Sequence, residues 1–79
     1  MKPGRSAVAS PFSLVIDDAM DGYVAWREES AAVEKSYRTW LSAGREDGAL
    51  AFAAYAAALD REERAASDYE QLIARAVAA

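Results

Sequence analysis

The sequence contains no cysteine and no histidine, and each absence excludes a class of chemistry. Without cysteine the chain cannot form a disulfide, a thiolate nucleophile or a cysteine-built zinc or iron–sulfur site. Without histidine it cannot form the Ser-His-Asp or Cys-His arrangements that activate a nucleophile. We therefore expect no resident cofactor and no catalytic triad.

Long apolar runs, an excess of basic residues and strand-forming residues are also scarce. The apolar run at 49–59 is eleven residues long, which is too short to span a bilayer. Nine Lys and Arg residues against thirteen Asp and Glu residues give a net charge of −4, the wrong sign for a dedicated nucleic-acid binder. Few Val, Ile and Thr residues disfavour an all-β fold. These observations predict a cytoplasmic protein that binds neither nucleic acid nor a membrane.

Alanine, in contrast, is abundant, with 20 residues among the 79 of the chain. Because alanine is the best helix former, this composition predicts an all-α protein, and the length predicts a single domain. A high-GC bacterial coding sequence is an alternative explanation for the alanine, since Arg also outnumbers Lys by seven to two.

Turn and cap residues divide the chain into two helices. Pro11 suits a first helical position after Ser10, which can cap the helix, and Gly44 suits a left-handed residue just past a helix end. Asp47 is a good N-cap for a second helix. We therefore expect a flexible leader over 1–9 and one helical-hairpin domain over 10–79, with helices over about 11–43 and 47–78.

Both expected helices carry a heptad pattern, with apolar residues recurring in alternating steps of three and four. The positions are Ile16, Ala19, Tyr23, Trp26, Ser30, Val33, Tyr37 and Trp40 in the first helix, and Phe52, Tyr55, Leu59, Glu62, Ala66, Tyr69, Ile73 and Ala76 in the second. Folded about the turn, the two series pair with residue numbers that add up to 92, so that Trp40 faces Phe52 and Trp26 faces Ala66. The pattern predicts an antiparallel, coiled-coil-like two-helix hairpin with the aromatic residues in its core.

The two polar residues of this pattern, Ser30 and Glu62, fall opposite each other. A partly buried polar pair at such a position typically fixes the register of two helices, and this is the role we predict. Glu62 could alternatively pair with Arg27, or serve as an acid or base in catalysis.

The sequence carries more apolar surface than one stripe per helix can cover. Ala51, Ala58, Ala65 and Leu72 form a column spaced by seven beside the predicted core of the second helix. Small side chains let another helix approach closely, so we expect this column to form a homodimer interface within a four-helix bundle. A different protein partner would serve the same surface.

The function predicted from these patterns is a non-enzymatic interaction module, an adaptor or regulator acting through a helical bundle. The alternative is a metal-dependent hydrolase that uses carboxylates near the middle of the hairpin, namely Glu28, Glu29, Asp60 and Glu63. Magnesium sites in helical bundles need repeated acidic pairs on neighbouring helices, and this chain offers one such pair, Asp60 with Glu63. Our main prediction therefore contains no metal site.

Overall fold

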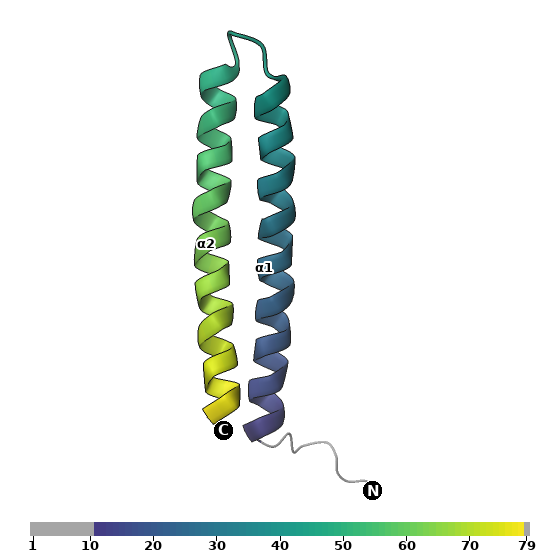
Figure 1. Ribbon diagram of the computed structural model, residues 1–79. Coiled ribbons are helices and arrows are strands. Elements are labelled where there is room, and N and C mark those ends of the chain that lie inside the picture. The colour runs from purple at the N-terminus through teal and green to yellow at the C-terminus, as the bar shows by residue number, and fades with distance from the viewer. Residues whose placement is uncertain (1–10, 79) are drawn as a thin grey trace, which may run out of the picture.

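The computed structural model describes residues 11–78, which form two α-helices that pack side by side. Helix α1 spans Pro11–Ser42 and helix α2 spans Gly48–Ala78. The helices run in opposite directions, with a short connection at one end and Pro11 and Ala78 at the other (Figure 1). The described part of the chain has no strand. This confirms the predicted all-α helical hairpin, while the expected leader and Ser10 lie outside the described residues.

Helix α1 ends at Ser42, one residue before the predicted end, and Gly44 does not end it in the predicted way. The Ala43 amide donates a hydrogen bond of 3.2 Å to the carbonyl of Trp40, which tightens the last turn. Gly44 does not have a positive φ, so the prediction of a left-handed residue there was wrong. The tightened turn satisfies a terminal carbonyl without that conformation.

Asp47 occupies the N-cap position of α2. Its carbonyl accepts a hydrogen bond of 2.9 Å from the Ala51 amide, which is the first bond of the helix, and α2 begins at the next residue, Gly48. The Asp47 amide in turn donates to the carbonyl of Gly44 at 3.1 Å, which closes the connection. The connection therefore has a defined geometry that sets how the two helices face each other.

Aromatic contacts between the helices follow the register predicted from the sequence. Ring centroids lie 5.6 Å apart for Tyr23 and Tyr69, 5.4 Å apart for Tyr37 and Tyr55, and 5.0 Å apart for Trp40 and Phe52. The residue numbers in all three pairs add up to 92, as the heptad pattern requires. The register of the hairpin is therefore confirmed along most of its length.

The two tryptophans depart from this one-to-one pairing. Trp26 was predicted to face Ala66, but its ring stacks on Tyr69 with a centroid distance of 5.7 Å and an interplanar angle of 13°. Trp40 stacks in the same way on Tyr55, at 5.5 Å and 17°. An indole is long compared with the 5.4 Å rise of one helical turn, so it reaches a neighbour beyond its direct partner.

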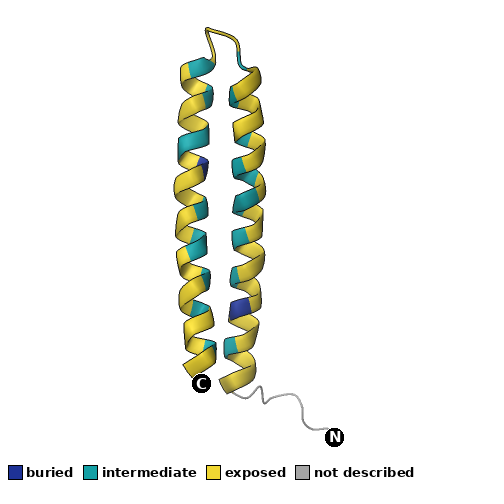
Figure 2. Ribbon diagram, viewed as in Figure 1, coloured by how far each residue is buried: buried dark blue, intermediate teal, exposed yellow. Residues whose placement is uncertain are grey.

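The hairpin buries very little. Among residues 11–78, only Ala19 and Ala58 are buried, and Figure 2 shows these as two short segments on the facing sides of the helices. The aromatic residues between the helices are at best half-buried, because a single neighbouring helix can cover only one side of each ring. The fold therefore leaves most of its apolar surface accessible.

Candidate functional site

A polar cluster lies near the middle of the hairpin, where α1 and α2 face each other. The indole Nε1 of Trp26 donates a hydrogen bond of 2.7 Å to Oε2 of Glu62, and Oγ of Ser30 donates to the same oxygen at 3.4 Å. The predicted neighbours Ser30 and Glu62 are thus brought together. Within residues 11–78, Arg27 forms no ion pair with Glu62, and its guanidinium carbon lies instead 5.8 Å from the centre of the Trp26 ring.

The short bond from Trp26 is the stronger of the two interactions, since a charged acceptor strengthens a hydrogen bond. It holds the Glu62 carboxylate between the helices and links residues that are 36 positions apart in the chain. The register-setting role of Ser30 and Glu62 stays a prediction. The geometry shows an anchored carboxylate with neutral donors around it, which suits a structural role better than proton transfer.

The four carboxylates considered for a metal site, Glu28, Glu29, Asp60 and Glu63, do not form a cluster. Across residues 11–78, no group of three or more acidic side chains is placed to hold a metal ion. Glu29 pairs instead with Arg61, with 3.3 Å between Oε1 and Nε. The arrangement therefore gives no support to the alternative of a metal-dependent hydrolase.

The column predicted to form a dimer interface lies between the two helices of one chain. Ala58 is 0% exposed, Ala51, Ala65 and Leu72 are half-buried, and Leu72 lies close to Gly22 of α1. These residues are covered because their small side chains let α1 and α2 of the same chain approach each other closely. Within the hairpin, Ala58 is covered completely and the other three residues are covered in part. The homodimer interface at this column stays a prediction. We call this side of the hairpin the small-residue face.

On the other flank of the aromatic contacts, helical spacing aligns nine of the thirteen large apolar side chains that are exposed among residues 11–78, and we call this flank the apolar face. It comprises Ile16, Met20, Tyr23, Tyr37 and Leu41 of α1, and Phe52, Leu59, Ile73 and Val77 of α2. These residues are between 39% and 82% exposed, although six of them were predicted to belong to the core. Near the chain ends, Ile16, Met20 and Ile73 help to line a hollow of about 180 Å³ on this face.

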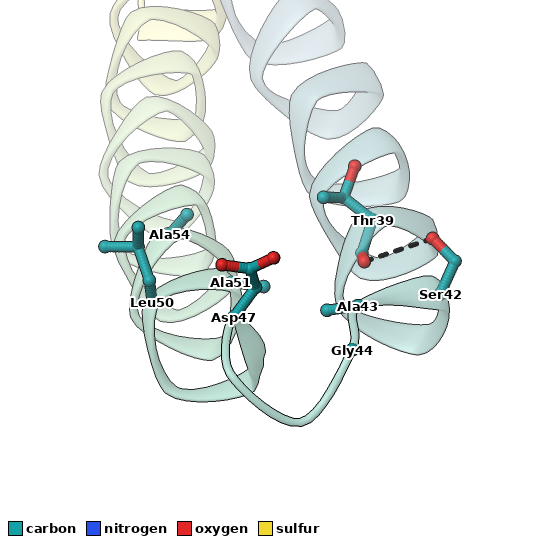
Figure 3. A pocket seen from close by; sticks show the side chains of 8 residues that line it. All are labelled: Thr39, Ser42, Ala43, Gly44, Asp47, Leu50, Ala51 and Ala54. Carbon is teal, nitrogen blue, oxygen red and sulfur yellow. Dashed lines mark hydrogen bonds between the residues drawn. The ribbon is translucent and has the colours of Figure 1, made fainter.

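A second hollow, of about 470 Å³, lies beside the connection on the small-residue side. Figure 3 shows Thr39 from α1, Ala43 from the connection, and Leu50 and Ala54 from α2 around it. The hydroxyl of Thr39 donates to a backbone carbonyl of its own helix, so it is already satisfied. With one carboxylate in its lining, from Asp47, this hollow has no acid–base pair that could support a reaction.

Comparison of the chain with models of protein families, with curated proteins and with solved structures finds no match. Neither helix of the described residues is long and apolar enough to cross a membrane. The evidence about function therefore comes from the chain's own geometry.

Sequence reasoning missed one contact of the polar cluster. Trp26 binds Glu62, and a signal for this existed, because Trp26 lies one helical turn from Ser30, which is the residue opposite Glu62 in the register. Gly22 lies in a column with Glu29, Ser36 and Ala43, spaced by seven residues. Because glycine has no side chain, Leu72 and Tyr69 of α2 come close to this position.

Proposed function

We propose that the protein is a non-enzymatic protein–protein interaction module that acts as a homo-oligomeric helical bundle, in an adaptor or regulatory role. The observation that supports this is the imbalance of burial. Only Ala19 and Ala58 are buried among residues 11–78, whereas thirteen large apolar side chains are exposed, nine of which belong to the apolar face. A two-helix hairpin gains little stability from its own core, because the entropy of ordering the chain offsets the gain. Association covers the exposed residues and completes the core.

The size of the particle in solution tests this proposal. Sedimentation equilibrium from micromolar to submillimolar concentration should give a mass of at least twice the 8.5 kDa of one chain. The melting temperature, followed by circular dichroism, should rise with protein concentration, because association stabilises the folded state by mass action. A folded 8.5 kDa species with a concentration-independent melting temperature over the whole range would contradict the proposal.

A further inference from the structure

We propose that the apolar face binds a second copy of this chain, with α1 of each copy lying along α2 of the other and both connections at the same end of the bundle. This inference rests on the proposed function and specifies the face and the arrangement through which the module associates. In this arrangement the residues of the small-residue face pack between α1 and α2 of the same chain. The residues of the apolar face pack between the two chains.

The exposed area of the apolar face matches what a dimer needs. A large apolar residue has about 200 Å² of accessible surface, and the nine residues of the face are on average about half exposed, which leaves roughly 900 Å² per chain. A standard protein interface buries about 800 Å² on each partner. The summed exposed area of the nine residues is therefore large enough for one side of such an interface.

Charges at the edges of the apolar face are complementary between its two helices. Arg27 follows Tyr23 by one turn on α1, whereas Glu63 follows Leu59 by one turn on α2. Within residues 11–78, neither Arg27 nor Glu63 forms an ion pair. Glu34 follows Arg27 by seven residues but pairs with Arg38 of its own chain, and Glu70 follows Glu63 by seven residues. The α1 edge of the face thus presents an unpaired cation, and the α2 edge presents carboxylates.

A twofold axis parallel to the helices brings these charges together. Residues of α1 and α2 lie at the same height when their numbers add up to about 92, as the Tyr23–Tyr69 contact shows. A rotation about this axis does not change the position of a residue along the bundle. Arg27 therefore lies level with residue 65 of the second copy, within one helical turn of Glu63 there. Because the dimer is symmetric, the interaction between Arg27 of one copy and Glu63 of the other forms twice. Leu41 lies level with residue 51 of the second copy, beside the small side chain of Ala49, where a large residue fits.

The other closed arrangement places α1 against α1 and α2 against α2, with the copies antiparallel. It would set Arg27 against Glu34 of the second copy, but Glu34 already pairs with Arg38 in its own chain, with 3.5 Å between Oε1 and Nη2. It would also bring the two copies of Glu63 close together near the axis, and like charges in an interface oppose association. The charges therefore favour α1 against α2.

Two exposed leucines beside the connection provide a matched test of the face. Leu41 lies on the apolar face and is 64% exposed, whereas Leu50 lies outside it and is 75% exposed. In sedimentation equilibrium of the full chain, Leu41→Glu should raise the dissociation constant of the dimer by at least about tenfold, because it places a charge in the interface. Leu50→Glu should leave the constant unchanged. Dissociation by Leu50→Glu with an intact Leu41→Glu dimer would overturn the inference.

Charge reversal tests the arrangement and controls for variants that fail to fold. Arg27→Glu and Glu63→Arg should each weaken the dimer, and the double variant should restore its affinity, which a misfolded chain could not do. Failure of the double variant to restore affinity would overturn the α1-against-α2 arrangement, as would restoration by Arg27→Glu with Glu34→Arg. A wild-type chain that stays monomeric throughout defeats the proposed function itself, so the two failures are distinguishable.

Discussion

Gly22 offers a direct test of how closely the two helices approach. A Cβ atom added at this residue would lie 2.6 Å from Cδ1 of Leu72 and 3.6 Å from the Cα of Tyr69. The second distance is an ordinary contact, but the first requires the Leu72 methyl group to move. Because that atom ends a flexible, half-buried side chain, Leu72 can rotate away without a shift of the backbone.

Two opposing effects of Gly22→Ala then nearly cancel. Replacing glycine by alanine inside a helix stabilises the folded state by about 1 kcal/mol. Forcing the Leu72 side chain from its preferred rotamer costs about 0.5–1.5 kcal/mol. The free energy of unfolding should therefore change by less than about 0.5 kcal/mol. In a Leu72→Ala background the obstacle is gone, and Gly22→Ala should stabilise by the full amount, about 1 kcal/mol.

Urea unfolding followed by far-UV circular dichroism, at one fixed protein concentration, measures both values. The matched control is Ala25→Gly at an exposed position of the same helix, which should destabilise by about 1 kcal/mol and so reports the helix propensity alone. If Gly22→Ala stabilised the chain equally with leucine and with alanine at residue 72, the close approach of α2 to Gly22 would be refuted.

Two further predictions concern the polar contacts between the helices. Glu62→Ala should lower the free energy of unfolding by roughly 1.5–3 kcal/mol, because Trp26 Nε1 loses a charged acceptor, while Glu62→Gln should cost less than half as much. Equal losses in urea unfolding would contradict this hydrogen bond. Arg61→Gln should change stability by less than about 1 kcal/mol, because its ion pair with Glu29 is exposed to solvent; a larger loss would show that the pair is coupled to the core.

Much of the fold was predictable from the sequence, because a hairpin is specified by local signals. Pro11 and Asp47 define where the two helices begin, and the three–four spacing of aromatic residues indicates that each helix packs through the side that carries these rings. The connection is too short to allow many registers, so the aromatic pairs, such as Trp40 with Phe52, follow from the spacing.

The rotation of each helix about its own axis was not predictable from the same pattern. On α2, two rotations of the helix both place Tyr55 and Glu62 in the centre of the contact with α1. One rotation adds the column of residues that contains Ala58, and the other adds the column that contains Leu59. Both columns give alternating steps of three and four. Packing decides between them, because Gly22 and Ala58 permit a closer approach of the two backbones than the bulkier leucine column does. Spacing alone contains no information about that preference.

The candidate site was predictable in part for the same reason. Opposite register positions identified Ser30 and Glu62 as neighbours, whereas the reach of the Trp26 indole depends on its rotamer, which the sequence does not specify. The interaction surface was assigned to the small-residue face because excess alanine indicated close helix packing. Within one chain, Ala58 and Leu72 of that face already pack towards α1, and the larger apolar side chains are left exposed.

The hairpin connectivity also has a consequence for the order in which the structure forms and opens. Contacts near the connection join residues close in sequence, such as Trp40 and Phe52, which are 12 positions apart, whereas Tyr23 and Tyr69 are 46 positions apart. Closing the longer loop directly costs about 1.2 kcal/mol more in chain entropy. We therefore expect the ring contacts beside the connection to form first, and the contacts farther from the connection to form one after another. Opening follows the reverse order, so the aromatic rings farthest from the connection separate first.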